Sequence, residues 1–236
     1  AKFFVIASGS TPMVPPIPGL ERVPYYTNET IFTDPEQPQH LLVIGGGPIG
    51  VEMAQAHVRL GSKVTIVEAA QLMGRDDPEL VGKLSQRLSA DGITIIEGAS
   101  VASVKGKAGQ ITVSLDDGRT LSASHLLIAV GRRPAVAGLG LDAGCVASTS
   151  AGITTNRRLR TSNPRVYAIG DVTGRAQFTH IASYHAGIVI RNILFKLPAK
   201  VNEAIQPWVT FTDPELAHVG LGEATAAAIW GAANIQ

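Results

Sequence analysis

Cysteine is the scarcest residue, because the 236-residue sequence contains only one, Cys145. A single cysteine excludes an intramolecular disulfide and a cysteine-based metal cage within the chain, and it is consistent with a cytoplasmic protein. Charge is scarce too: Asp, Glu, Lys and Arg make up 17% of the chain, and the net charge is +1. This balance predicts neither a nucleic-acid partner nor a membrane surface. No apolar run reaches the roughly 20 residues of a membrane-spanning helix.

Glycine and proline are abundant in contrast, with 25 and 14 residues. Seven of the prolines lie in residues 11–40, where the sequence has no helical or alternating apolar period. This segment is therefore expected to be an extended connector between domains. The whole chain is 45% hydrophobic with almost no net charge, which excludes a disordered protein.

Residues 41–96 have the pattern of a βαβαβ unit. Short apolar runs at 41–44, 63–67 and 93–96 are typical of buried parallel strands. One helix is expected to begin at Pro48, and a second to begin after a cap at Asp77. The face of the first helix that packs on the sheet is predicted to consist of Ile49, Met53, Ala56 and Leu60. Because such crossovers are right-handed, the fold class is α/β with a Rossmann-like parallel sheet.

The apolar period changes to two between residues 98 and 122, which predicts a small antiparallel meander. Residues 126–130 then return to the buried sheet. A further strand is expected at 166–169, followed by a helix from about residue 177 to residue 197.

The turn after the first strand contains the pattern Gly45-x-Gly47-x-x-Gly50. In a strand–turn–helix context the first glycine permits the tight turn, the second lets a pyrophosphate approach the backbone, and the third lets helix and strand pack closely. The helix amino terminus then offers unpaired N–H groups to the phosphates. We interpret this turn as a dinucleotide-binding loop.

Glu68 ends the second strand, close to the position where an acidic residue binds the ribose hydroxyls of NAD. A carboxylate there would repel a 2′-phosphate, so NAD(H) is preferred over NADP(H). A solvated glutamate beside a tight turn is the alternative reading. Arg75 lies on the connection to the second helix, where it is either a solvated loop residue or a partner for a 2′-phosphate.

Five motifs in chain order resemble the class I pyridine nucleotide–disulfide oxidoreductases, the group of dihydrolipoyl dehydrogenase, mercuric reductase and glutathione reductase. They are Phe4-Val5-Ile6-Ala7-Ser8-Gly9-Ser10, where Ser8 replaces the usual Thr; Gly50-Val51-Glu52; Ala129-Val130-Gly131-Arg132-Arg133-Pro134; residues 161–171, which end in Gly170-Asp171; and Phe211-Thr212-x-Pro214-Glu215-x-Ala217-x-Val219-Gly220.

The resemblance implies roles for individual residues. Those that would contact the nicotinamide dinucleotide are Gly45, Gly47, Pro48, Gly50, Glu52, Glu68 and Gly131. Those that would contact FAD in the full-length protein are Gly9, Gly170, Asp171 and His180. Glu52 would lie beside the nicotinamide amide, unless it only favours the helix dipole from the first turn. Asp171 would bind the ribityl chain, unless it only caps a helix.

The resemblance also implies a division of the chain. Residues 1–40 would end the FAD-binding half and form the connector, 41–131 would be the NAD-binding domain, 132–205 would return to the FAD domain, and 206–236 would begin the dimerisation domain. The fold is thus expected to be a nicotinamide-binding domain flanked by parts of two others.

The family's chemistry needs a cysteine pair, a first FAD loop and a carboxyl-terminal His–Glu pair, and this sequence contains none of them. We therefore expect the nicotinamide-binding core of a longer, homodimeric flavoprotein, with no catalytic residue of its own and little or no bound FAD. The sequence does not distinguish whether that longer protein resembles dihydrolipoyl dehydrogenase or mercuric reductase. A non-catalytic nucleotide-sensing or interaction module is the alternative, although it would not need the flavin motif at Gly170-Asp171.

No metal site is expected. His180 and His185 lie on one predicted helix, but their side chains would be about 140° apart around its axis. Cys145 lies in a loop rich in glycine and alanine, without a neighbouring base.

Overall fold

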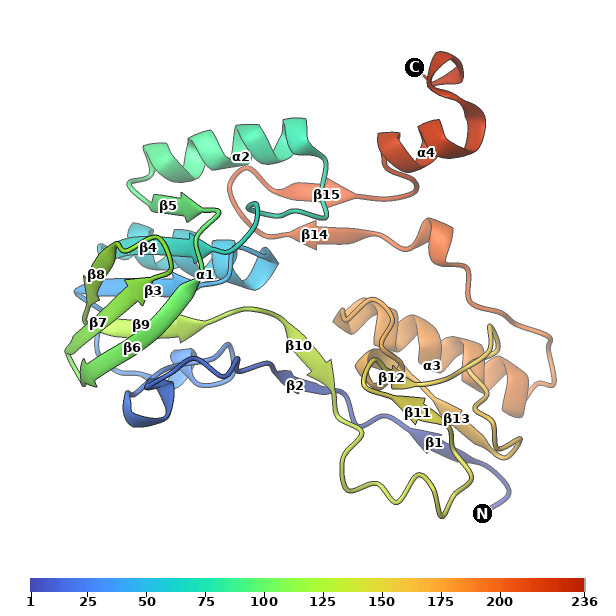
Figure 1. The fold of residues 1–236 in the computed structure, drawn as a ribbon. Helices are drawn as coiled ribbons and strands as arrows, with labels where there is room; N and C mark the ends of the chain where they lie inside the picture. The colour runs from blue at the N-terminus through green and yellow to red at the C-terminus, as the bar shows by residue number, and fades with distance from the viewer. Residues whose placement is uncertain (236) are drawn as a thin grey trace. The chain divides into compact units, whose positions relative to one another are not determined.

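The computed structural model describes residues 1–235 and divides into two compact units. The first unit consists of residues 1–11 and 132–208, and the second of residues 12–131 and the segment from 209 onward. Figure 1 shows the elements of both units, coloured along the chain.

The second unit is built on a four-stranded parallel sheet with the strand order β5-β4-β3-β9. Its strands are β3 (His40–Ile44), β4 (Lys63–Glu68), β5 (Thr94–Glu97) and β9 (His125–Ile128), with helices α1 (Pro48–Arg59) and α2 (Pro78–Ala90) in the crossovers. The Asp77 carboxylate caps α2 by accepting the N–H of Glu79 at 2.9 Å. The α/β fold with a Rossmann-like βαβαβ unit is therefore confirmed.

The central strand β3 is buried on both faces. Leu41 and Val43 point into one core, which contains residues of α1 and α2. Leu42 and Ile44 point into a second core, beneath the antiparallel meander. That meander comprises β6 (Val101–Lys107), β7 (Gln110–Leu115) and β8 (Thr120–Ala123), and it confirms the change of period read from the sequence (Figure 1).

The predicted buried face of α1 is wrong in part. Ala56 is exposed, and Leu60 lies beyond the last helical residue with 71% of its surface exposed. The buried residues are Gly50, Val51, Ala54 and Gln55. The apolar spacing fits two overlapping stripes of one helix, and the contacts of the folded chain decide between them.

The connector also differs from expectation, because two short 3-10 helices, η1 (Leu20–Arg22) and η2 (Ile31–Thr33), interrupt it. Tyr26 bridges to Leu127 of the sheet, and Ile31 is buried in the core with α1 and α2. These apolar residues among the prolines tie the segment to the second unit.

The first unit is centred on α3 (Thr179–Ile193) and several short strand pairs. The strands are β1 (Phe4–Ile6), parallel to β13 (Val166–Ala168); β2 (Ser10–Pro12), beside β10 (Arg132–Pro134); and β11 (Ser148–Thr149), antiparallel to β12 (Gly152–Ile153). Helix α3 ends at Ile193, earlier than predicted, and Lys196 takes a left-handed conformation (φ +55°) before Pro198 is reached.

The remaining elements are the 3-10 helices η3 (Gly170–Thr173), η4 (Glu203–Ile205) and η5 (Ala232–Asn234), the paired strands β14 (Trp208–Thr210) and β15 (Leu216–His218), and α4 (Glu223–Trp230). Among residues 1–235, no helix is long and apolar enough to cross a membrane.

Candidate functional site

The glycine turn after β3 leaves no room for side chains at two of its positions. Gly45 has φ +108°, and a Cβ there would lie 2.5 Å from the carbonyl oxygen of Ala129. A Cβ at Gly50 would lie 2.0 Å from the carbonyl oxygen of Gly45. The turn therefore packs closely against the backbone that follows β9, and the start of α1 packs closely against the turn.

Gly47 differs, because a Cβ at this position would meet no atom within 4 Å. It is the N-cap of α1, and Pro48 is the first helical residue. In the first helical turn, the N–H groups of Ile49 and Gly50 have no carbonyl partner within the helix. Open space beside unpaired N–H groups fits the pyrophosphate of a dinucleotide, which would be held by Gly47 and the first turn.

The carboxylate of Glu68, at the end of β4, reaches the same turn. It accepts the N–H of Gly46 at 2.7 Å and the N–H of Ala70 at 2.9 Å, one on each oxygen. Each carboxylate oxygen has a second lone pair, so both can still accept a ribose hydroxyl. Arg75 is exposed in the turn before α2.

Glu52 lies in the second turn of α1, so the alternative role in the first turn does not apply. One carboxylate oxygen accepts the N–H of Phe211 at 2.8 Å. Burial raises the pKa of the Glu52 carboxyl group, and the hydrogen bond from Phe211 offsets this rise in part.

This raised pKa predicts a pH-dependent effect of Glu52→Gln on stability. A carboxyl group whose pKa is higher in the folded protein contributes stability below its unfolded pKa of about 4.3, and that contribution is lost as the pH rises through the folded value. The glutamine amide of the variant stays neutral and can still accept the Phe211 N–H. We expect the variant to have the higher Tm at neutral pH and an equal Tm below about pH 4. Calorimetry at both pH values measures the Tm of each protein. The same Tm difference between the two proteins at both pH values would contradict the prediction.

In the first unit, three motif residues that are far apart in sequence come together. The Ser10 hydroxyl donates to the Asp171 carboxylate at 2.6 Å and accepts from Nε of Arg132 at 2.7 Å. The predicted FAD residue Asp171 is thus oriented by Ser10, which Arg132 holds in turn, and the sequence had singled out neither of these two residues. Ser10 belongs to the motif of residues 4–10 and Arg132 to the motif of residues 129–134, and these motifs are the sequence feature that pointed to them. A carboxylate acceptor held in this way fits the ribityl hydroxyls of FAD.

The other predicted FAD residues lie around the same unit. Gly170 has φ +68° and donates its N–H to Nδ1 of the buried His185 at 3.1 Å, and Gly9 has φ +71°. Burial, helped by Arg175, lowers the pKa of His185 to about 4, so its ring is neutral at physiological pH. His180 is exposed, with Nε2 at 2.7 Å from the carbonyl oxygen of Pro207.

Gly131 belongs to the second unit. It has φ +117°, its carbonyl oxygen accepts the N–H of Met13 at 2.9 Å, and a Cβ there would meet no atom within 4 Å. The space beside its Cα therefore leaves room for a ligand.

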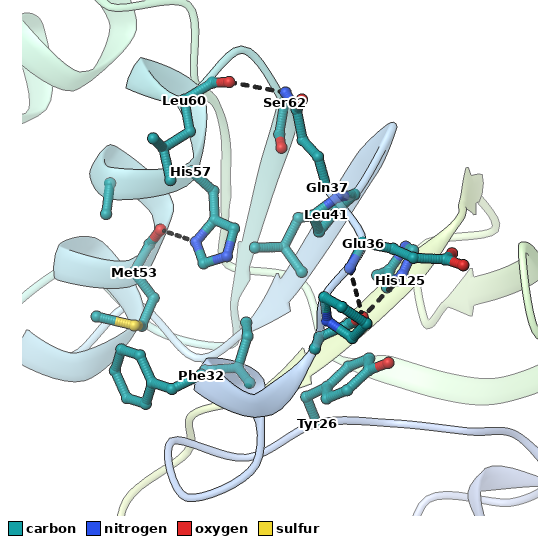
Figure 2. A pocket seen from close by; sticks show the side chains of 15 residues that line it. Tyr26, Phe32, Glu36, Gln37, Leu41, Met53, His57, Leu60, Ser62 and His125 are labelled. Atoms are coloured by element: carbon teal, nitrogen blue, oxygen red, sulfur yellow. Dashed lines mark hydrogen bonds and ion pairs between the residues drawn. The ribbon is translucent and has the colours of Figure 1, made fainter.

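A separate cavity of about 390 Å³ lies between the connector and α1 (Figure 2). At one end the Asp34 carboxylate lies 3.4 Å from Nε2 of His125, and its hydrogen bond with Tyr26 raises the pKa of that phenol to about 12. His57, whose Nδ1 lies 2.7 Å from the Met53 carbonyl oxygen, also lines it. No residue of the glycine turn borders this cavity, so it is distinct from the predicted nucleotide site.

Within residues 1–235, no group of three or more His, Cys, Asp or Glu side chains could hold a metal ion. Cys145 is exposed and free.

Comparison with known proteins adds independent information. The family model "pyridine nucleotide-disulphide oxidoreductase" matches residues 1–186. The chain is 38% identical over 228 residues to a mercuric reductase of Streptomyces lividans, covering 95% of this chain and 48% of that protein. It is 39% identical over 233 residues to a dihydrolipoyl dehydrogenase of Chlorobaculum tepidum, covering 96% and 49%.

Among solved structures, the Cu(II) complex of the HOCl-induced flavoprotein disulfide reductase RclA from Escherichia coli is similar, with a TM-score of 0.90 and 33% identity. That match covers 96% of this chain and 53% of RclA. The chain therefore spans about half the length of the curated relatives it matches.

Proposed function

Because the chain belongs to the pyridine nucleotide–disulphide oxidoreductase family, we propose that its second unit binds the nicotinamide dinucleotide of a flavoprotein oxidoreductase. In the complete protein, bound NAD(H) and FAD would supply the hydride chemistry. The residues of this chain bind and orient those groups. Glu52 would face the nicotinamide end, and Gly131 would offer backbone to the cofactor.

The observation that carries the proposal is the glycine turn together with Glu68. Gly45 and Gly50 bring the backbone into close contact, Gly47 leaves an open approach, and the Glu68 carboxylate lies beside that approach. An anion at the ribose end disfavours a 2′-phosphate, which supports NAD(H) over NADP(H). The substrate that receives the electrons is the finer point on which mercuric reductase-like and dihydrolipoyl dehydrogenase-like members differ.

The test is a titration of NADH against Glu68→Arg. Reversing the charge removes the ribose acceptor, so we expect NADH binding to weaken by about tenfold or more and NADPH to gain relative to NADH. Quenching of NADH fluorescence measures both affinities. Glu79→Arg makes the same charge change on the exposed side of α2 and should leave both affinities as they are. Equal NADH affinity in the parent and Glu68→Arg would refute the assignment.

We further propose that FAD is held by the first unit only in the complete protein, around Asp171. The 236 residues contain a single G-x-G-x-x-G loop, and it belongs to the second unit. The chain by itself is therefore expected to bind FAD weakly or not at all. Purification in excess FAD followed by an absorbance spectrum tests this, because stoichiometric flavin would show as a yellow protein.

The complete protein is further proposed to be a homodimer in the cytoplasm. Exposed apolar side chains near the carboxyl end, Val219, Ile229 and Trp230, support a partner surface there.

A further inference from the structure

The segment that follows residue 208 packs on helices α1 and α2 of the second unit, although it lies far from them in sequence. Leu216 is 5% exposed and belongs to the same core as the residues of both helices. Thr210 and Thr212 are also buried. This segment is therefore an integral part of the nucleotide-binding unit.

Gln55 holds the segment through one buried amide. Only 4% of Gln55 is exposed, which is unusual for an uncharged polar residue on a helix that covers a sheet. Its Oε1 accepts the N–H of Asp213 at 2.7 Å, and its Nε2 donates to the carbonyl oxygen of Asp213 at 3.0 Å. One side chain thus binds both backbone groups of one residue, much as a neighbouring strand would.

Charged side chains surround this amide. Nε2 of Gln55 also donates to the Asp91 carboxylate at 2.8 Å. Arg59 contacts the carboxylates of both Asp91 and Asp213, at 3.2 and 2.7 Å, and Arg87 contacts Asp91 at 3.0 Å. Because the side chains of Arg59 and Arg87 are 41% and 48% exposed, solvent screens these ion pairs and they add little by themselves. The buried amide is the part that fixes a single geometry.

The same segment contacts Glu52 two residues earlier, where the Phe211 N–H donates to the Glu52 carboxylate at 2.8 Å. Glu52 and Gln55 are three residues apart on α1 and therefore share one face. Residues 211–213 thus form a short bridge with one end on each side chain. Holding Asp213 in place holds the Phe211 N–H in place, and that N–H orients the carboxylate.

We propose that Gln55 is a positioning residue, whose amide fixes the 211–213 bridge so that the Glu52 carboxylate is held in one orientation at the nicotinamide end of the site. The inference rests on the proposed function for the role of Glu52. It adds a residue that touches neither cofactor and acts through the backbone of a distant segment.

The test compares Gln55→Met with the parent in the complete, flavin-loaded protein. Methionine has a similar volume but lacks the amide donor and the amide acceptor. We expect faster amide hydrogen exchange in residues 209–213 and about tenfold slower reduction of the flavin at saturating NADH. The Kd for NADH should change far less, because the pyrophosphate and ribose contacts lie at Gly47 and Glu68. Gln55→Glu keeps an acceptor for the Asp213 N–H, but it sets a carboxylate oxygen against the Asp91 carboxylate and the Asp213 carbonyl oxygen, so it should not restore the protection.

The controls separate positioning from general destabilisation. Leu60→Gln, at an exposed position just beyond the same helix, should leave exchange and flavin reduction unchanged. In a Glu52→Gln background, Gln55→Met should slow reduction little further, since no carboxylate remains to be oriented. Additive effects of the two substitutions, or unchanged exchange in Gln55→Met, would overturn the inference. If the parent does not bind NADH, the proposed function fails and the positioning role fails with it, whereas NADH binding with additive effects overturns the positioning role alone.

Discussion

Gly50→Ala is expected to destabilise the protein by about 3 kcal/mol or more and to abolish NADH binding. The new Cβ would lie 2.0 Å from the carbonyl oxygen of Gly45, which is backbone and has no rotamer to change. Either α1 or the turn must move, and both are packed against the buried strand β3. In a free helix the same change would be favourable by up to about 1 kcal/mol, so the clash outweighs the propensity. Urea unfolding followed by circular dichroism measures the loss.

Gly82→Ala is the matched control. Gly82 lies inside α2, is exposed, and would place its Cβ in open space. Here propensity acts alone, and we expect stabilisation by about 0.5–1 kcal/mol. If Gly50→Ala stabilised the protein as Gly82→Ala does, the backbone of Gly45 could not lie close enough to Gly50 to exclude a Cβ.

Gly47→Ala is expected to have the opposite profile, with a stable fold and weak nucleotide binding. Gly47 has φ −78°, an ordinary value for alanine, and its Cβ would meet no protein atom within 4 Å. The free energy of unfolding should therefore change by less than about 1 kcal/mol. The added methyl group occupies the approach of the pyrophosphate, so NADH should bind at least about tenfold more weakly.

Fluorescence titration with NADH and urea unfolding of the same sample separate the two effects. Gly82→Ala should bind NADH like the parent, which controls for a glycine-to-alanine change elsewhere in the same unit. Parental affinity in Gly47→Ala would place the pyrophosphate elsewhere and would remove the main support for the nucleotide site.

The sheet and the glycine turn could be read from the sequence because their signals are local. A strand that is buried on both faces, such as β3, needs a continuous run of apolar residues. A turn that another stretch of backbone approaches closely needs glycine, because no Cβ fits there. The cap at Asp77 is equally local, since a carboxylate there reaches the N–H groups two and three residues ahead.

The buried face of α1 could not be read in this way. Ile49, Met53, Ala56 and Leu60 form a valid apolar stripe, yet Gln55 is more buried than Leu60. An interpretation from hydrophobic periodicity assumes that polar side chains face the solvent. Here the segment around Asp213 covers the Gln55 amide and forms hydrogen bonds with it. The hydrogen bonds from Ser10 to Asp171 and from Arg132 to Ser10 are of the same kind, since each joins residues more than 100 positions apart.

The apolar runs and the glycine spacing by themselves determined the α/β class and predicted a dinucleotide loop, and the five motifs in chain order indicated the family by resemblance. Tertiary structure alone decided which polar groups are buried and which residues orient Glu52 and Asp171. The physical reason is that strand, turn and cap signals act within a few residues. Hydrogen bonds such as Gln55 to Asp213 exist only after the chain has brought distant backbone and side chains within about 3 Å.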